Sequence, residues 1–410
     1  IRPLHPEVPV LALTASATPK VVDDIQERLS FKSKNVLRKS FFRDNLAYFI
    51  DWDEDKMGKI ERIATKQGGS GIVYMRSRRG CERIARALQE RGLSVDHYHA
   101  GLDTDERTKR QQAWMEGKTQ IIVATNAFGM GIDKPDVRFV VHCDLPDTLE
   151  NYYQECGRGG RDGKKAFAIS LLTQKDVDSF DEKVVRSFPK KETIRSVYES
   201  LGSLLQLAIG SGQGETFRVD LDILSQRTGL DIRALSHCLK FIEREGHISI
   251  QERSRFQSEV KIITTHESVR SLRDQESTPG QVLEALLRSY PRLFDETSMI
   301  SEWTLARRLG LDKQKVIDSL IWLDQSGHIA YAQASELPKI TFLEERIPTK
   351  NLRLSDEHYR IRKHVVQEKA EAMRNYVNDT HQCRSRMILS YFGEIEAEDC
   401  GMCDVCLQRK

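Results

Sequence analysis

Up to Leu172, short stretches with strand character alternate with longer stretches of helical period. The predicted strands are Val8–Leu13, Gly71–Met75, Ser94–Ala100, Ile121–Thr125, Val137–His142 and Phe167–Leu172. The predicted helices are Pro19–Leu29, Arg78–Arg91 and Thr104–Gly117. The first strand is a continuous apolar run, which is typical of a buried parallel strand. This alternation predicts βαβ units and an α/β domain with a parallel sheet.

After Lys175 the helical period takes over and two similar units follow. One starts at Phe217 and ends in EREGHISI, and the other contains Val282 and ends in LDQSGHIAYA. Each has a helix, a turn at Gly-Leu-Asp, and a second helix with apolar residues at i, i+3, i+4 and i+7. A Gly-His-Ile step then leads into a strand. This weak internal repeat predicts two winged-helix units.

The second helix of each unit is expected to contribute to a core. The predicted core residues are Leu235, Leu239, Ile242, Val316, Leu320 and Leu323. Gln251–Pro279 is predicted to be the wing strand of the first unit and a linker, and Leu337–Leu343 the wing strand of the second. Neither second helix is strongly basic, so sequence-specific DNA reading is not favoured over a protein-binding role.

The C-terminal part begins with a helix of mixed charge from about Ser355, and a second helix starts near Cys383. Four cysteines there have the spacing C-x16-C-x2-C-x2-C, namely Cys383, Cys400, Cys403 and Cys406. Cysteines separated by two residues direct both thiolates at one ion, and four thiolates form a closed tetrahedral site. We therefore expect structural Zn²⁺. The remaining cysteines are expected to be packed thiols.

Composition limits the possible partners. The chain has 410 residues, 30% of them charged, and a formal net charge of +2. This length predicts two to four domains, and the near-neutral balance means that any basic surface for nucleic acid must be local. No run of about 18 apolar residues occurs, so no membrane span is expected. The crowding of cysteines near the C-terminus suits metal binding in a reducing cytoplasm better than disulfides.

The stretch Thr125–Gly163 carries the densest candidate chemistry. A strand ends in a loop containing Gly129 and Gly131, and a later turn holds Arg158 and Arg161 among glycines. Loops at the carboxyl ends of parallel strands are where open α/β sheets bind ligands. Two guanidiniums that stay protonated beside phosphate suit an anionic ligand. The competing interpretation is a plain surface turn, which the preceding strand and loop disfavour.

These residues resemble motifs V and VI of superfamily 2 helicases, and in particular of the RecQ family. The matching sequences are ATNAFGMGIDKPDVRFVVH and QECGRGGRDG, with an oddity at Gly160, near where an alanine-type residue is usual. The resemblance implies that Arg158 and Arg161 face the γ-phosphate of ATP, with Arg161 as the arginine finger. The other implied residues of the nucleotide site are Gln154, Gly131 and Asp133.

Two further stretches extend the resemblance. LALTASATP is similar to motif III, which implies coupling of nucleotide state to DNA through Thr14, Ser16 and Thr18. Arg-Ser-Arg after a predicted strand resembles motif IV. Polar residues at the strand ends suit contacts with a DNA backbone, which position a strand without reading its sequence. The DNA-binding residues expected at this edge are Arg76, Ser77, Arg78, His99, Gly101, Thr125 and Asn126.

The sequences Cys-Arg at position 383, YFGE and CGMCDVC resemble the RecQ zinc-binding module. In the commonest RecQ arrangement this module directly follows the second motor lobe, whereas two winged-helix units precede it here. No residue is therefore assigned to the wing hairpin that separates DNA strands. The zinc module is expected to stand on a different domain from the arginines.

The predicted architecture is a multidomain chain with an α/β RecA-like motor lobe, mainly helical winged-helix units and a zinc-binding helical hairpin. The expected parts are 1–39, the C-terminal edge of a first RecA-like lobe; 40–178, the second lobe; 179–275 and 276–350, the winged-helix-like units; and 351–410, the helical hairpin with zinc. The chain begins without Met and contains no GxxxxGK[ST] or DExH sequence. We therefore expect the ligands of ATP and Mg²⁺ on upstream sequence.

The resemblance implies part of a monomeric, ATP-dependent 3′-to-5′ DNA helicase of repair or recombination, located in the cytoplasm or nucleoid. Its expected cofactors are ATP, Mg²⁺ and Zn²⁺, and its expected partners are single-stranded DNA and duplex or junction DNA. The 410 residues alone are expected to be inactive. The alternative is a DNA-binding or regulatory winged-helix and zinc protein whose helicase-like lobe does not hydrolyse ATP. That alternative leaves the paired arginines unexplained.

Overall fold

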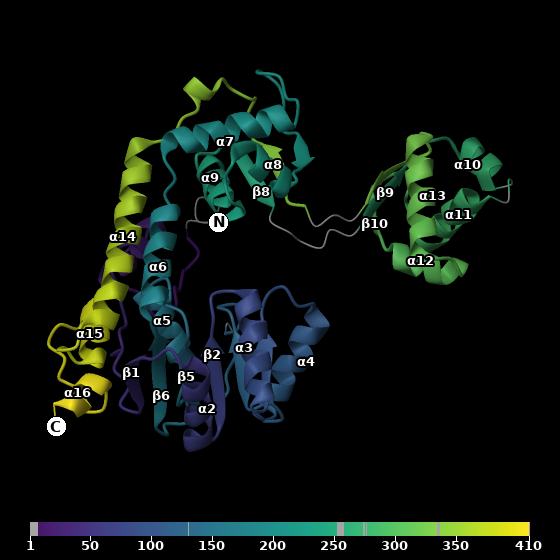
Figure 1. Ribbon diagram of the computed structural model, residues 1–410. Helices are drawn as coiled ribbons and strands as arrows, with labels where there is room; N and C mark the ends of the chain where they lie inside the picture. The colour runs from purple at the N-terminus through teal and green to yellow at the C-terminus, as the bar shows by residue number, and fades with distance from the viewer. Residues whose placement is uncertain are drawn as a thin grey trace. The chain divides into compact units, whose positions relative to one another are not determined.

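In the computed structural model the described residues are 7–129, 131–251, 258–273, 275, 277–333 and 337–409. The chain divides into two compact units, Ile1–Phe188 with Asp356–Lys410, and Pro189–Ser355. The first unit is thus completed by the C-terminal part of the chain (Figure 1). Of the described helices, none combines the length and apolar character that a membrane span requires.

Six parallel strands form the sheet of the first unit, and the five after the first lie where the alternating pattern predicts strands. They are β1 (Leu46–Trp52), β2 (Ser70–Tyr74), β3 (Val95–Tyr98), β4 (Ile121–Ala124), β5 (Val137–His142) and β6 (Ala166–Leu172). Their spatial order is β1-β6-β5-β2-β4-β3, and every neighbouring pair is parallel. The predicted α/β lobe with a RecA-like sheet is confirmed.

Helices cover both faces of this sheet. The described helices of the first unit are α1 (Pro19–Arg28), α2 (Lys56–Gln67), α3 (Arg78–Glu90), α4 (Thr104–Met115), α5 (Leu149–Cys156), α6 (Gln174–Arg186), α14 (Asp356–Asn378), α15 (Arg384–Tyr391) and α16 (Asp404–Gln408). Successive strand residues face opposite cores. Val73 and Val123 pack with residues of α2 and α3, whereas Ile72 and Ile122 pack with Trp114 of α4. Burial on both faces explains why the central strands read as continuous apolar runs.

The N-terminal segment departs from the prediction. Val8–Leu13 is not a buried strand: Leu11 is 81% exposed and Leu13 is 84% exposed. Among the described residues no strand pairs with this segment, so its backbone lacks a ladder and its side chains lack cover. The helix that follows is present and has Pro19 in its first turn, although the side chain of Thr18 makes no capping bond.

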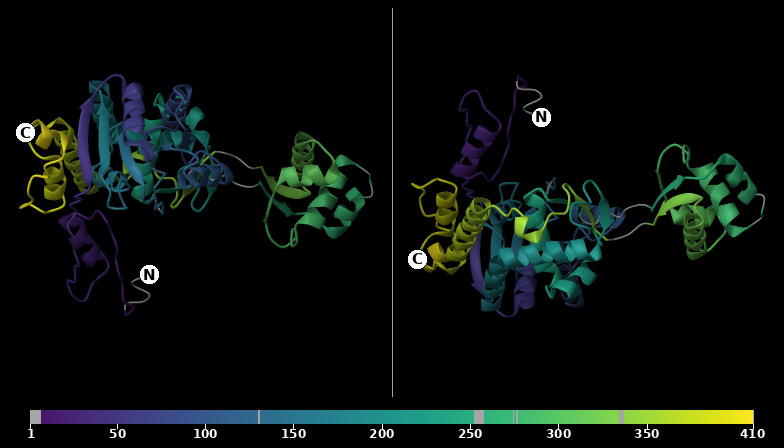
Figure 2. Two further views of the ribbon diagram at one scale, coloured as in Figure 1. Left: turned by 90° about the horizontal axis from the view of Figure 1, so that it is seen from below. Right: turned by 90° about the horizontal axis from the view of Figure 1, so that it is seen from above.

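The C-terminal helices belong to the core of the first unit. α14 and α15 share one apolar cluster with β1, β6 and α5, and they lie beside the β1 edge of the sheet (Figures 1 and 2). Tyr376 of α14 lies 5.1 Å from Tyr152 of α5, measured between ring centroids. Phe392, which follows α15, lies 5.2 Å from Tyr153 of α5. The expectation that the zinc module stands apart from the arginines is therefore wrong, because α5 leads directly into their turn.

The second unit contains two winged-helix bodies, as the internal repeat predicts. The first consists of α7 (Lys191–Leu204), β7 (Thr216–Arg218), α8 (Leu221–Thr228), α9 (Ile232–Arg244), β8 (Ile248–Gln251) and β12 (Lys339–Phe342), followed by the short helix η1 (Thr349–Asn351). The second consists of β9 (Ser258–Ile262), α10 (His266–Arg273), α11 (Thr278–Ser289), β10 (Ser298–Ile300), α12 (Glu302–Leu309), α13 (Lys313–Gln325) and β11 (Ile329–Ala332).

The repeated turn has the same physical basis in both bodies. Gly229 and Gly310 adopt left-handed backbone angles and end α8 and α12. Asp231 and Asp312 then cap α9 and α13 by accepting backbone N–H groups. All six predicted core residues of α9 and α13 are buried. The helix-turn-helix interpretation is confirmed.

The assignment of wing strands is wrong. β12, within the predicted second wing Leu337–Leu343, pairs antiparallel with β7 and β8 of the first body. β9, within the predicted first wing and linker, is the central strand of the second body. A strand's own sequence specifies its two faces but not its partner, so the local pattern could not separate these pairings. The second body is consequently inserted between two strands of the first.

Candidate nucleotide site, DNA edge and zinc centre

The two arginines lie on the turn after α5, and both reach the loop after β4. Arg158 donates to the backbone oxygen of Gly129, and a Cβ at position 129 would lie 2.0 Å from its guanidinium. Glycine is needed there for this close approach. Arg161 donates to the backbone oxygen of Ile132 at 2.9 Å and to Asp133 at 2.7 Å. The fold therefore brings together the arginines and the predicted nucleotide-site loop.

The Arg161–Asp133 pair faces solvent. The Asp133 side chain is 80% exposed and that of Arg161 is 35% exposed. Exposed ion pairs contribute little stability. An arriving phosphate could replace Asp133 as the partner of Arg161 at small cost. Gly131, between the two contact points on the loop, has a φ of 79°, a left-handed conformation that favours glycine.

Sequence reasoning missed two residues that hold the arginine turn. Arg43, just before β1, donates to the backbone oxygens of Gly159 at 3.0 Å and Gly160 at 3.2 Å, and more weakly to that of Gly157 at 3.4 Å. Asn45 donates to the oxygen of Gly160 at 2.6 Å. The only signal in the sequence is a pair of polar residues between a linker and a strand, and this pair lies outside motifs III to VI.

Arg76 occupies a buried network. Its guanidinium donates to Glu155 of α5 at 2.9 Å, and its side chain is 17% exposed. His142 at the end of β5 donates to the same carboxylate at 2.9 Å. Burial would raise the pKa of Glu155, but the bond from His142 and the charge of Arg76 hold that pKa below its usual value. Burial lowers the pKa of His142. Arg76 thus joins β2 to α5, and its predicted DNA contact stays a prediction.

The other predicted DNA-binding residues lie after β2, β3 and β4, which are adjacent parallel strands. Ser77 caps α3 by accepting the N–H of Gly80. Arg78 lies against Gly101, because a Cβ added to Gly101 would be 3.0 Å from the Arg78 guanidinium. His99 is 4% exposed, contacts Glu82 at 3.0 Å, and has a buried Nδ1 without a partner among the described residues.

The remaining two residues of this edge follow β4. Thr125 is buried and accepts the N–H of Ala127 on its hydroxyl at 3.4 Å, whereas Asn126 is exposed. The sheet therefore gathers the predicted residues at the carboxyl ends of three neighbouring strands. Their contacts with DNA stay predictions.

The predicted coupling residues meet the arginine helix. Gln154 of α5 donates to the hydroxyl of Ser16. Thr14 accepts the N–H of Ser16 on its own hydroxyl at 3.3 Å, and Thr18 accepts the N–H of Val22 on its backbone oxygen. Residues assigned to motifs III and VI on separate grounds are thus in direct contact.

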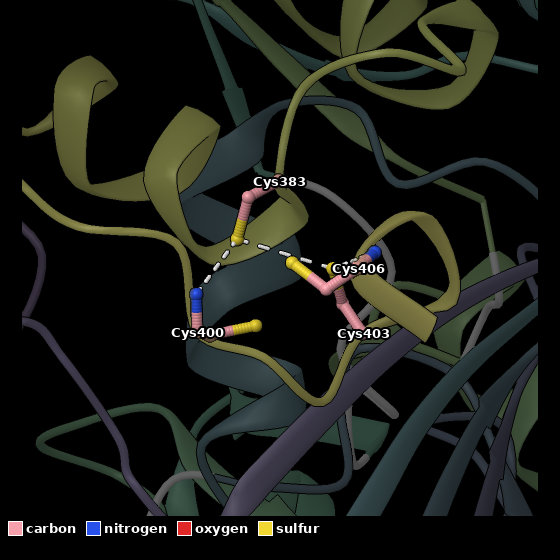
Figure 3. Close-up of side chains that lie close together, drawn as sticks. All are labelled: Cys383, Cys400, Cys403 and Cys406. Carbon is pink, nitrogen blue, oxygen red and sulfur yellow. Dashed lines mark hydrogen bonds between the residues drawn. The ribbon is translucent and has the colours of Figure 1, made fainter. Parts of the chain in front are cut away.

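The four predicted zinc ligands converge on one point (Figure 3). Their sulfurs all lie within 4.8 Å of one another. The Sγ atoms of Cys383 and Cys403 are 3.9 Å apart. In a tetrahedral site with Zn–S distances of about 2.3 Å, neighbouring sulfurs lie about 3.8 Å apart. The residues Cys383, Cys400, Cys403 and Cys406 therefore fit a structural Zn²⁺, and no fourth position is left for water.

The zinc site is tied to the sheet. Arg384 beside the first ligand donates to Asp404 at 3.0 Å, and both side chains are nearly buried. Asp404 also accepts the backbone N–H of Ile50 on the edge strand β1 at 3.2 Å. The Arg384–Asp404 ion pair of the zinc site thus satisfies a backbone N–H at the edge of the sheet.

A second cluster of metal-ligand types is formed by Glu82, His97 and His99. A guanidinium nitrogen of Arg110 lies 2.9 Å from both ring nitrogens of His97. That charge opposes a cation, so we assign no metal there. The four remaining cysteines are free and buried. Burial raises the pKa of Cys81 and of Cys143 to about 12, as expected for packed thiols.

Comparison with known proteins follows these structural divisions. Three family models match: the helicase conserved C-terminal domain over residues 55–163, the RecQ helicase winged-helix domain of Bacteroidota over 260–333, and the RecQ zinc-binding domain over 343–407. The winged-helix match coincides with the inserted second body.

Two curated relatives illustrate the similarity. The chain is 45% identical to the RecQ-like DNA helicase blm-1 of Caenorhabditis elegans over 175 residues, 42% of this chain and 18% of the relative. It is 39% identical to the ATP-dependent DNA helicase RecQ of Bacillus subtilis over 177 residues, 43% of this chain and 30% of the relative. The matched region thus spans less than a third of either relative.

Among solved structures, Dbp5 of Saccharomyces cerevisiae bound to RNA and ADP BeF3 matches with a TM-score of 0.36 and 22% identity. The match covers 41% of this chain and 47% of that one. The fold described above is assigned from its own strand order and not from this likeness.

Proposed function

Because this chain belongs to the RecQ family of superfamily 2 helicases, we propose that it forms the second motor lobe and the accessory units of an ATP-dependent DNA helicase that moves 3′ to 5′. One observation carries the proposal: Arg158 and Arg161 converge on the loop Gly129–Asp133 at the carboxyl edge of a parallel sheet. Fixed guanidiniums at such an edge suit the charge that develops during phosphoryl transfer.

In this proposal each group has a defined task. Arg161 stabilises the transferred phosphoryl group, Arg158 orders the loop, and Gln154 transmits the change to Ser16. The phosphate loop and the Mg²⁺ ligands, which do not occur in these 410 residues, belong to a first lobe. Zn²⁺ held by the four cysteines keeps the C-terminal loop folded. The substrates are single-stranded and duplex or junction DNA in repair or recombination, and the protein acts as a monomer.

The test is DNA-stimulated ATP hydrolysis and unwinding by a protein that contains both lobes. A duplex with a 3′ single-stranded tail should be unwound, and the same duplex with a 5′ tail should not. The 410-residue chain alone should bind DNA without hydrolysing ATP. Turnover by the 410-residue chain, abolished by Arg161→Ala, would contradict the division between lobes. DNA binding with no hydrolysis by the two-lobe protein would favour the regulatory alternative.

A further inference from the structure

The segment Tyr391–Glu394, which begins at the last residue of the zinc-module helix α15, contacts the linker before β1. One carboxylate oxygen of Glu394 accepts the backbone N–H of Phe41 at 2.7 Å, and the other accepts the hydroxyl of Ser40 at 2.7 Å. The Ser40 hydroxyl in turn accepts the N–H of Phe42 at 3.1 Å. A single carboxylate therefore organises three consecutive linker residues.

Aromatic contacts hold the same point from a second side. The ring of Phe41 stacks on Phe392, with centroids 4.4 Å apart and planes 13° apart. It also meets Tyr153 of α5 edge-on at 5.6 Å. The Tyr153 hydroxyl donates to the backbone oxygen of Phe41 at 2.9 Å. Both backbone polar groups of Phe41 are thus satisfied by side chains from outside the linker, which fixes irregular backbone.

The same segment touches the start of α1. Gly393 has a φ of 91°, and a Cβ built there would lie 2.7 Å from Cγ of Pro19. Arg43 lies two residues after Phe41 along the chain, and its guanidinium donates to the backbone oxygens of the arginine turn. The linker residue fixed by the zinc module is therefore close in sequence to the residue that holds Arg158 and Arg161.

We propose that Tyr391–Glu394 is a clamp that fixes the linker at Ser40 and Phe41. Glu394 is then a positioning residue for the arginine turn, acting through Phe41 and Arg43. The clamp itself follows from the contacts. Its effect on catalysis rests on the proposed helicase function.

Hydrogen exchange of the 410-residue chain tests the clamp directly. In Glu394→Ala, the Phe41 amide should exchange about 10-fold faster or more, because a hydrogen bond to a charged acceptor is lost. Glu394→Gln should be intermediate, since an amide offers one acceptor oxygen. Glu396→Ala removes an exposed charge from the same loop and should match wild type. Zinc content should be equal in all four proteins. Wild-type exchange at Phe41 in Glu394→Ala would overturn the clamp.

Steady-state kinetics of the two-lobe protein test the positioning role. Glu394→Ala should lower kcat for DNA-stimulated ATP hydrolysis about 3- to 10-fold with an unchanged KM for ATP, and Glu394→Gln should recover most of it. An unchanged kcat, despite faster exchange at Phe41, would overturn the positioning role. A wild-type protein without DNA-stimulated hydrolysis would overturn the proposed function instead, and the exchange result would still decide the clamp.

Discussion

Alanine substitution at Gly159 and at Gly160 should test how much the backbone geometry of the arginine turn matters while both arginine side chains are kept. Gly160 has a φ of 64°, and a Cβ there would lie 2.6 Å from the Asn45 amide nitrogen and 2.8 Å from the backbone oxygen of Lys164. A left-handed alanine costs about 1–2 kcal/mol before any clash. Because a backbone oxygen cannot swing aside, we expect Gly160→Ala to destabilise the lobe by about 2–3 kcal/mol.

Gly159 is the matched control. A Cβ there would lie 3.2 Å from Leu46, 3.3 Å from the backbone oxygen of Cys156 and 3.4 Å from Ala166, all longer than the contacts at Gly160, and the φ of Gly159 is not positive. Gly159→Ala should cost less than about 1 kcal/mol. The turn therefore accommodates a Cβ more easily at Gly159 than at Gly160.

Gly160→Ala should also lower turnover strongly, because a shift of the backbone at position 160 displaces the side chains of Arg158 and Arg161. A misplacement of about 1 Å in a catalytic group can cost about 100-fold in rate. We expect that loss for Gly160→Ala and less than about a threefold loss for Gly159→Ala. Thermal unfolding and DNA-stimulated ATP hydrolysis, measured on both variants, provide the test. Equal behaviour of the two variants in both assays would refute the assignment of the left-handed position.

Three further substitutions address Arg161 as the proposed arginine finger, Arg43 as its support, and one of the zinc ligands. Arg161→Ala should lower kcat about 1,000-fold while the KM for ATP stays nearer normal, and Arg161→Lys should not restore kcat. If steady-state kinetics instead show an equal loss of ATP binding and turnover, Arg161 binds the ground state and the transition state alike. Arg43→Ala should lower kcat about 10-fold or more without changing zinc content, since the backbone oxygens of the turn lose their donor; unchanged kcat would contradict this. Cys400→Ser should reduce bound zinc, measured by elemental analysis, together with thermal stability and DNA affinity. Because α14 and α15 share a core with α5, ATP turnover should fall as well, and full turnover in a zinc-free variant would show that the two regions are uncoupled.

Local signals in the sequence predicted much of this structure. The Gly-Leu-Asp turns identified both helix-turn-helix pairs, because one glycine ends a helix and one aspartate starts the next within three residues. The cysteine spacing identified the zinc centre for a similar reason. The paired arginines were located by their glycines, of which Gly129 proves necessary for the approach of Arg158.

The errors concern information that is not local. The sequence of β12 predicts a strand but contains nothing that selects β7 and β8 as neighbours. Val8–Leu13 is apolar enough for a buried strand, yet burial depends on what lies beside it. Arg43 was missed because its partners are backbone oxygens more than one hundred positions away, and backbone oxygens have no sequence signature.

The insertion of one winged helix into another has a consequence for the order of folding. The sheet of the first body cannot close until β12 has been synthesised, and residues 252–338 separate β12 from its neighbour β8. Compared with a tight hairpin, this loop is longer by about four doublings. The entropic cost of closing it is therefore higher by about 2 kcal/mol. Glu259 and Ala332 are paired across β9 and β11, so the inserted body, once folded, brings its own ends together. Early folding of the inner body on the ribosome would therefore shorten the effective loop and help its host to form.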